Sequence, residues 1–406
     1  MTDPVKFPLP PAPVPYEPSP ELRKLAARCP VTKAELPDGS TGWLVTGYNE
    51  VREVLTDRRY SRALVHAPGR NPRGVDSITS DGLLALDPPQ HSRLRKLVAG
   101  AFTDRRMQAL RPAVTRIVDD LVNAMIAGPR PADLKHAFSL PLPSSVICAL
   151  LGVPPEDVSR FHAWSDTIMA DWTRPRAEIA AAFDAIYAYM AGLIARKRQA
   201  PADDLISVLI EARDAGGKLS ERELVRFCFG LLLAGHETTA NQINMSFVAL
   251  SEHPAELARL RADPGLIPHA VEELLRFAQL TASSAIPLAR ITREEVCLGG
   301  VTIPAGEAVL PMRAVANRDP GAFPEPDRLD LLRAPTAHIA FGWGTHHCLG
   351  AQLARMELQE AFCGLLTRLP GLRMAVPLAN VEFHHGQALA TMRELPVTWD
   401  DVSRDG

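Results

Sequence analysis

One cysteine of the sequence has neighbours suited to binding a metal ion. Cys348 lies in the segment Phe341-Gly342-Trp343-Gly344-Thr345-His346-His347-Cys348-Leu349-Gly350. The glycines allow backbone geometries that other residues avoid, and they let the chain approach a flat ligand closely. Residues 351–366 are strong helix formers, so the sulfur is expected near a helix N-terminus, where the dipole and free amides favour a thiolate. A loop that presents one thiolate to open space suits an axial iron ligand.

Two other interpretations of this segment need weighing. A cysteine after a Gly-rich turn can simply be a small buried residue, as we expect for the remaining cysteines at positions 29, 148, 228, 297 and 363. Their scattered spacing predicts free thiols in a reducing compartment and no disulfide framework. His346, His347 and Cys348 could also bind zinc, but structural zinc usually takes four ligands in paired spacings. No partner pair is evident in the sequence.

The spacing Phe-x-x-Gly-x-x-x-Cys-x-Gly, filled by Phe341, Gly344, Cys348 and Gly350, resembles the heme-binding signature of the cytochrome P-450 superfamily. The soluble bacterial, actinobacterial-type branch is similar to this chain over nearly its whole length. The resemblance implies one mainly α domain with a small β portion, spanning residues 1–406. It also implies that heme b lies between a long central helix and the helix after Cys348, with Cys348 as the metal ligand.

The resemblance implies further contacts to the cofactor. The family's His-x-x-x-Arg pattern is matched by His91 and Arg95, its arginine before the late hairpin by Arg290, and its histidine before the ligand by His346. Charge-assisted hydrogen bonds from these groups would hold the two heme carboxylates. The remaining residues expected at the cofactor are Ala234, Phe341, Gly342 and Gly350.

The segment Ala234-Gly235-His236-Glu237-Thr238-Thr239 resembles the family's oxygen-activation site. The Thr238 hydroxyl can bond back to the carbonyl of Ala234, which loosens the helix, and Gly235 would help to open a groove where O2 binds. Thr238 would then hold water and Glu237 would relay protons, so these two are the expected catalytic residues. On residue pattern alone, the segment could also be a polar patch on a surface helix.

A third pattern is Glu273 with Arg276, which share one helix face. Alone it is common surface decoration. In the family the pair is structural and joins a downstream arginine, for which Arg328 is the expected match.

The resemblance implies a monooxygenase of secondary metabolism that inserts oxygen into a C–H bond of a substrate. No flavin or iron–sulfur module is evident, so a separate ferredoxin, with its reductase, or a flavodoxin would donate electrons. Arg93 and Arg355 are the expected basic docking residues. The substrate pocket is expected from residues 64–84, Met169 to Tyr189, Leu233 to Glu237, Ser283 to Ile286 and Ala388-Leu389. These later stretches are small or apolar and predict a hydrophobic substrate.

Two alternatives to oxygen insertion remain open. Oxidative aryl or indole coupling would use the same heme and the same motifs. A heme-binding sensor without turnover would not need the Glu237–Thr238 pair.

The elements that must position these residues are mostly helical. Ser220 and Glu223 predict a capping box that opens a helix running to about Glu252, roughly 48 Å long. Apolar spacing predicts helices over Leu110–Met125, ended by Gly128, and over Phe183–Ile194. Further predictions are a helix over Asn49–Leu55, a strand over residues 43–46, a hairpin turning at Gly299-Gly300, a strand near residues 395–399 and a Pro-rich extended arm over residues 1–20.

Bulk composition excludes some function classes. The chain has 406 residues, 46% of them hydrophobic, which allows a large core. A formal charge of −3 and a pI near 6.5 argue against nucleic-acid binding. The N-terminus has no basic start with an apolar stretch, and no apolar run reaches the roughly 18 residues of a membrane span. We therefore expect a soluble, cytoplasmic protein.

Overall fold

The computed structural model describes residues 4–14, 16–67, 82–169, 175–214, 219–280, 289–335, 337–384, 389 and 391–401. Its helices are α1 Pro20–Arg28, α2 Tyr48–Thr56, α3 Gln90–Ala99, α4 Asp104–Ala127, α5 Pro141–Leu151, α6 Val158–Met169, α7 Arg176–Gln199, α8 Leu205–Asp214, α9 Glu221–Glu252, α10 Pro254–Ala262, α11 Ile267–Phe277, α12 Arg313–Ala316 and α13 Ala351–Arg368. A mainly helical fold with small sheets confirms the predicted fold class.

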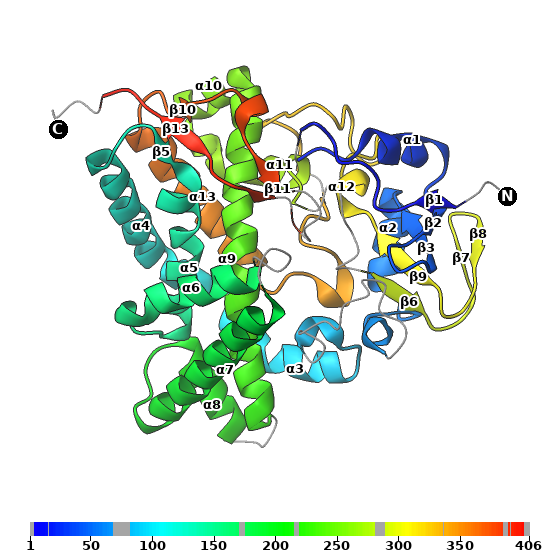
Figure 1. Ribbon diagram of the computed structural model, residues 1–406, viewed down its shortest axis with the longest axis horizontal. Helices are drawn as coiled ribbons and strands as arrows, with labels where there is room; N and C mark the ends of the chain where they lie inside the picture. Colours follow the sequence, from blue (N-terminus) through cyan, green and yellow to red (C-terminus); the bar gives the residue numbers. More distant parts are fainter. Residues whose placement is uncertain are drawn as a thin grey trace.

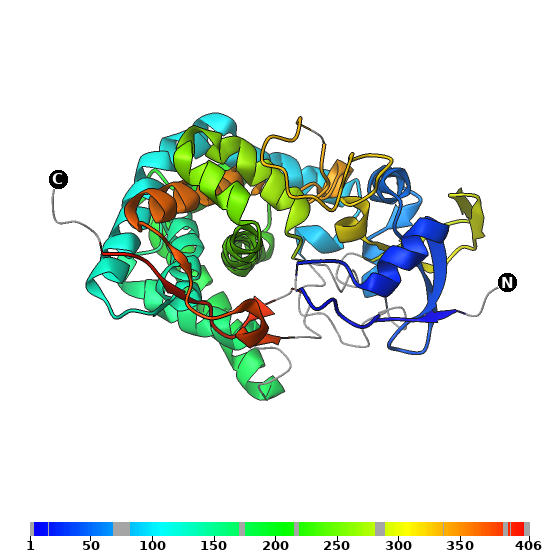
Figure 2. The same ribbon diagram turned by 90° about the horizontal axis from the view of Figure 1, so that it is seen from above.

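Helix α9 is the axis of the helical part, and the other helices pack around it (Figure 1). Figure 2 shows it almost end-on, in the middle of the molecule. Its start has the predicted capping box: the Ser220 hydroxyl accepts from the backbone N–H of Glu223, while the Glu223 carboxylate accepts from that of Ser220. Both orphan donors are thereby satisfied, so this long helix has a fixed origin.

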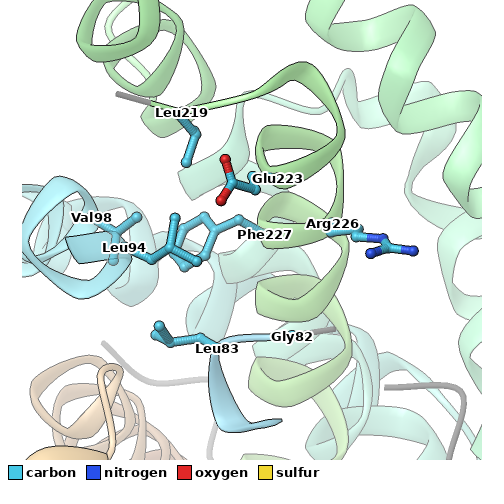
Figure 3. A pocket seen from close by; sticks show the side chains of 8 residues that line it. All are labelled: Gly82, Leu83, Leu94, Val98, Leu219, Glu223, Arg226 and Phe227. Atoms are coloured by element: carbon cyan, nitrogen blue, oxygen red, sulfur yellow. The ribbon is translucent and has the colours of Figure 1, made fainter. Parts of the chain in front are cut away.

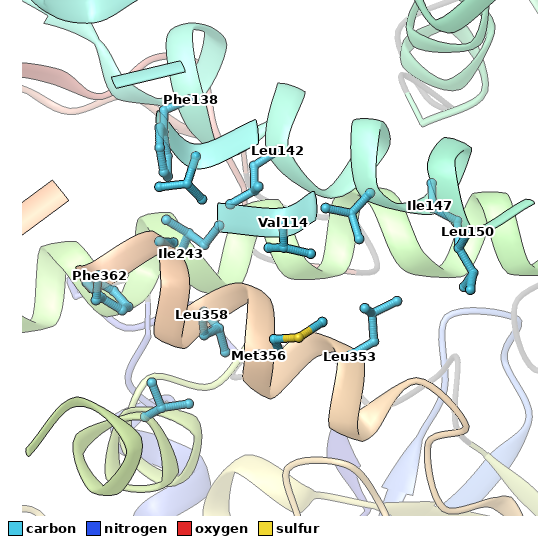
Figure 4. Packing of buried hydrophobic residues seen from close by; sticks show 14 of the residues in the cluster. Val114, Phe138, Leu142, Ile147, Leu150, Ile243, Leu353, Met356, Leu358 and Phe362 are labelled. Carbon is cyan, nitrogen blue, oxygen red and sulfur yellow. The ribbon is translucent and has the colours of Figure 1, made fainter. Parts of the chain in front are cut away.

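The main core lies where α4, α5, α9 and α13 meet (Figure 4). Leu142 on α5, Ile243 on α9 and Phe362 on α13 are completely buried. The predicted face of residues 110–125 supplies Val114, Val118 and Val122 from α4. A Cβ at Gly364 of α13 would lie 2.4 Å from a Val118 methyl carbon, so this glycine allows the two helices their close approach.

A six-stranded sheet forms the other side of the molecule, beside α1 and α2 (Figure 1). Its order is β1-β2-β3-β9-β6-β4, with β1 Val5–Lys6, β2 Val31–Glu35, β3 Thr41–Val45, β4 Tyr60–Ser61, β6 Arg290–Thr292 and β9 Ala308–Pro311. The predicted strand at 43–46 is thus central in this sheet. Residues close to each other here come from opposite ends of the sequence, as in the pairing of β3 with β9.

Three smaller sheets complete the β portion. Hairpin β7 Val296–Leu298 and β8 Val301–Ile303 turns at Gly299 and Gly300, both with positive φ, as predicted. The predicted C-terminal strand is β13 Pro396–Thr398, which lies between β10 Arg373–Met374 and β5 Ala132–Asp133. Strands β11 Phe383–His384 and β12 Thr391–Met392 form the third pair.

The Pro-rich arm is more firmly attached than an extended surface segment. Within its described residues, β1 pairs in parallel with β2, and Phe7 and Tyr16 are buried. The Tyr16 ring lies 5.7 Å from the ring of Phe277 on α11. The arm is therefore part of the packed structure.

One expectation about membrane spans needs correction. Helix α7 contains a stretch, Ala177–Gln199, that is long and apolar enough to cross a membrane by length and composition. It carries Glu178, Asp184 and the basic residues 196–198, and it packs against α6 and α9. A core helix of a soluble protein passes the same test, so this stretch is weak evidence for a membrane span.

Candidate functional site

The loop before α13 has the geometry that its glycines predict. The Cys348 backbone N–H donates to the carbonyl oxygen of Phe341, 2.9 Å away, which closes the loop. Gly342 and Gly344 have φ values of +74° and +66°. A Cβ at Gly344 would lie 2.8 Å from the carbonyl oxygen of Leu55 on α2. Both backbone conformation and close packing therefore require glycine at position 344.

The Cys348 sulfur lies in protein yet stays accessible. Its side chain is exposed by surface area, although burial is the leading cause that raises the pKa of its thiol. The Gly350 N–H and the arginines 313, 95 and 355 act in the opposite direction without outweighing burial. The amide at the start of α13 thus favours the thiolate in the predicted direction but does not outweigh burial, and metal binding would displace the proton.

The four side chains predicted to bind the heme carboxylates come together beside this loop. His91 and Arg95 come from α3, Arg290 from β6, and His346 from the loop itself. The rings of His91 and His346 lie 4.3 Å apart. Burial and the charge of Arg95 lower the pKa of His91 to about 4. Burial and the charge of Arg290 lower that of His346 to about 3.

This cluster has more positive than negative charge. Both ring nitrogens of His91 and Nδ1 of His346 are buried without a hydrogen-bond partner. The neighbouring carboxylate of Asp87 is already occupied by the Ser61 hydroxyl, the Arg62 backbone N–H and Arg293. Orphaned donors and surplus cations beside an accessible thiol fit a dianionic, iron-containing cofactor such as heme, whose two carboxylates would neutralise them.

The second motif lies in the middle of α9. The Thr238 hydroxyl donates to the carbonyl oxygen of Ala234, 2.7 Å away, as predicted. Ala234 is exposed although α9 crosses the centre of the molecule (Figure 2). On the same helix His236 and Thr239 are buried. Ala234 and Thr238 therefore lie on an accessible face of a central helix.

Helix α9 continues without interruption from Glu221 to Glu252, so the threonine bond lies within an unbroken helix. One detail of the prediction needs correction. A Cβ at Gly235 would lie 3.4 Å from Cδ1 of Ile147, on α5. Gly235 therefore serves the contact between α9 and α5, and it does not open a groove on the face of Thr238.

The predicted structural triad has a different third member. Glu273 forms a bidentate pair with Arg276 at 2.7 and 2.8 Å, and both side chains are buried. The second arginine on Glu273 is Arg333, whose Nε lies 3.0 Å from Oε1. Arg328 is not that residue: only its backbone carbonyl joins the network, and its side chain pairs with Glu325 at the surface.

Neither predicted docking residue presents an unpaired charge. Arg93 forms an ion pair with Glu223 at the start of α9. Arg355 forms a bidentate pair with Glu272 at 2.7 and 2.9 Å and stacks over the Phe341 ring. Arg355 therefore supports the Cys348 loop from the side of α13.

A small pocket, with a cavity volume of about 20 Å³, lies between α3 and the first turns of α9 (Figure 3). Its lining residues are Gly82, Leu83, Leu94, Val98, Leu219, Glu223, Arg226 and Phe227. The Phe227 ring points toward α3, while the Arg226 side chain points away (Figure 3). Gly82 and Leu83 belong to the 64–84 segment predicted to line a pocket. Of the other predicted lining, residues 68–81, 170–174, 281–288 and 388 lie outside the described residues.

Sequence reasoning missed one cation of this site. Arg313, at the start of α12, donates from Nη1 to the carbonyl oxygen of Ala340, 2.7 Å away, and its charge acts on Cys348. It belongs to none of the motifs recognised in the sequence. Only the pairing of β9 with β3 and β6 brings it to the Cys348 loop.

Comparisons with known proteins agree with this geometry. The family model described as cytochrome P-450 matches residues 158–264 and 265–370. Nocardicin C N-oxygenase of Nocardia uniformis subsp. tsuyamanensis is 46% identical over 95% of this chain and 97% of its own. Mycinamicin IV hydroxylase/epoxidase of Micromonospora griseorubida is 47% identical over 91% and 92%. A mutant of the mixed-function P-450 MycG, solved with mycinamicin V, superposes with a TM-score of 0.91 at 43% identity, covering 98% of this chain and all of that one.

Proposed function

The chain belongs to the cytochrome P-450 family and is a heme-dependent monooxygenase; from that premise we propose that it oxidises a small hydrophobic natural product. The observation that carries the proposal is the accessible face of α9, where the Thr238 hydroxyl lies on the Ala234 carbonyl. In this proposal residues 1–406 act as a single domain, and the protein works in the cytoplasm.

Each side chain of the site has a proposed task. Cys348 is the iron ligand, and the backbone of Gly342 and Gly344 holds its loop in place. His91, Arg95, Arg290 and His346 bind the heme carboxylates. Ala234, Phe341 and Gly350 line the faces of the cofactor. When bound, the heme supplies the activation of O2.

In this proposal, residues of α9 control proton transfer. The Thr238 hydroxyl donates to Ala234, so its own oxygen can accept a hydrogen bond from a water molecule in the site. We assign Glu237, which is half-buried, as the group that exchanges protons between solvent and that water. The apolar lining that the sequence predicts would exclude other water and orient the substrate.

The substrate class is supported by relatives of this chain. Their names describe oxidation of nocardicin C and mycinamicin IV, and a further relative from Streptomyces avermitilis is a pentalenic acid synthase. These names suggest tailoring of a secondary metabolite, and we propose the same for this chain.

We propose a ferredoxin with its reductase, or a flavodoxin, as electron donor. Arg93 is exposed and its ion pair with Glu223 is a surface pair, so Arg93 can still contribute to docking, and exposed cations beside it add to the same surface. Lys96 follows Arg95 on α3, and Arg105 and Arg106 open α4; all three are exposed. An acidic donor docked there would approach the helix that holds the cofactor.

The test combines ligand binding with turnover. Small hydrophobic compounds are screened for a low-to-high-spin shift of the ferric heme, and hits are incubated with a surrogate ferredoxin, its reductase, NADPH and ¹⁸O2. The proposal predicts a product that carries one ¹⁸O atom. A product that lost two hydrogens without gaining oxygen would indicate oxidative coupling, and spin shifts without any turnover would indicate a binding protein.

A further inference from the structure

Arg313 lies against the loop that holds Cys348, outside the set of cations that the family pattern supplies. Its Nη1 donates to the carbonyl oxygen of Ala340 at 2.7 Å. The same atom would lie 3.9 Å from a Cβ at Gly342. The side chain is half-buried by surface area, while surrounding protein lowers the pKa of its guanidinium to about 10. Like Cys348, it is enclosed by protein and still accessible.

The charge of Arg313 has no carboxylate partner among the described residues. Within the described part of the chain no acidic side chain pairs with it, and Cys348 is the one group of opposite charge that acts on it. Its Nε atom is buried without a hydrogen-bond partner. An enclosed guanidinium without an anion is strongly destabilising. An anion that binds in the adjoining site would remove this penalty.

The charges around Arg290 connect Arg313 with the cofactor site. Burial is the main cause that lowers the pKa of Arg290; among the charges Arg62 lowers it most, Asp87 opposes this, and Arg313 lowers it further. The guanidinium of Arg62 donates to the carbonyl oxygens of Leu84 and Ala289. His346 lies beside the His91 ring and responds to the charge of Arg290. An anion that binds beside Arg290 would therefore also be attracted to Arg313.

We propose that Arg313 is a further cation of the heme site, beside Arg95 and Arg290, and binds one heme carboxylate together with Arg290. The inference rests on the heme site of the proposed function and extends it to a residue outside the family pattern. The heme carboxylate would also give the unpaired Nε atom of Arg313 a hydrogen-bond partner. The thiolate is the less suitable anion for Arg313, because iron takes its charge when the cofactor binds.

Heme release tests the proposal directly. Arg313→Met removes the cation and keeps a long side chain, whereas Arg313→Lys keeps the charge. Transfer of heme from the holoenzyme to apomyoglobin should be about tenfold faster for Arg313→Met, since a hydrogen bond to a charged group is lost. Arg313→Lys should recover most of the retention. Arg318→Met is the matched control, because Arg318 is also buried but contacts Asp327 and Phe277; it should lower thermal stability and leave heme release unchanged.

Heme dimethyl ester separates the carboxylate from other roles. Loaded with this ester, which lacks both negative charges, the wild type and Arg313→Met should release the cofactor at equal rates. A tenfold difference that persists with the ester would overturn the proposal and indicate that Arg313 only supports the loop. Equal release of unmodified heme by the two proteins would overturn it as well.

A second neutral variant and the reduction potential of the heme extend the test. If Arg313→Met does not fold, Arg313→Gln retains a donor for Ala340 and removes the charge, and the same ester comparison applies. The midpoint reduction potential should fall in both neutral variants, because a nearby positive charge favours the reduced heme. A wild type that binds no heme would refute the cofactor assignment, whereas equal retention by all variants refutes only the role of Arg313.

Discussion

The Nε atom of Arg333 lies 3.0 Å from Oε1 of Glu273, and the same carboxylate holds Arg276. One buried anion therefore balances two guanidinium groups that join α11 to the segment before the Cys348 loop. Glu273→Gln should lower the free energy of unfolding by about 3–5 kcal/mol, because it leaves two buried cations without an anion. Urea unfolding measures this loss.

The same network distinguishes two arginines. Arg333→Met should destabilise the fold clearly, whereas Arg328→Met should stay within about 0.5 kcal/mol of the wild type, since its side chain forms only a surface pair. Equal losses for both substitutions would contradict the assignment of Arg333.

Gly344 should not tolerate a side chain. Gly344→Ala would place a Cβ against the Leu55 carbonyl at positive φ, so we expect a loss of about 1–3 kcal/mol and a weaker heme-thiolate signal. Gly230→Ala is the control: position 230 is helical, and a Cβ there meets nothing within 4 Å. That substitution should stabilise the protein by about 0.5–1 kcal/mol. Heat-induced unfolding and the reduced, CO-bound spectrum measure both effects, and an unaffected Gly344→Ala would refute the steric argument.

Thr238 should control coupling of electrons to product. Thr238→Ala removes the hydroxyl that orders water, so product formation should fall roughly a hundredfold while NADPH oxidation continues and releases hydrogen peroxide. Thr238→Ser, which keeps the hydroxyl, should preserve most product formation. Product and peroxide are measured per NADPH consumed. Unchanged coupling in Thr238→Ala would remove Thr238 from proton delivery.

Glu272 should make the support of the Cys348 loop sensitive to acid. Burial alone would raise the pKa of its carboxyl, but hydrogen bonds from His338 and Arg355 outweigh burial and lower it from 4.5 to about 2. Because the folded-state pKa is depressed, the stabilisation is complete above about pH 4.5 and disappears as the pH falls toward 2. Thermal melts should show Glu272→Gln melting a few degrees below the wild type at pH 7, with the gap closing in that acid range. A gap that stays constant with pH would contradict the ionic origin.

The parts of the site that local sequence encodes were predictable. The capping box at Ser220, the Gly-rich turn before Cys348 and the Thr238–Ala234 bond each depend on residues within a few positions of one another. The charged residues that come together from distant segments were harder to predict. Arg333 replaced Arg328, and Arg313 was missed, because the path of the chain between β9 and α13 decides which arginine reaches the site. Gly235 was misinterpreted for a similar reason, since only packing shows that it faces Ile147 on α5.

The Glu223 carboxylate has two partners, the backbone N–H of Ser220 and the guanidinium of Arg93 on the helix that also supplies His91 and Arg95. It also lines the α3–α9 pocket. For protein engineering, this gives Glu223 a structural role that its neighbours Leu83 and Phe227 do not share. Randomising Leu83 or Phe227 changes cavity shape, whereas randomising Glu223 would also release the start of α9 from the cofactor helix. A library that leaves Glu223 fixed should contain a larger share of folded, heme-loaded variants.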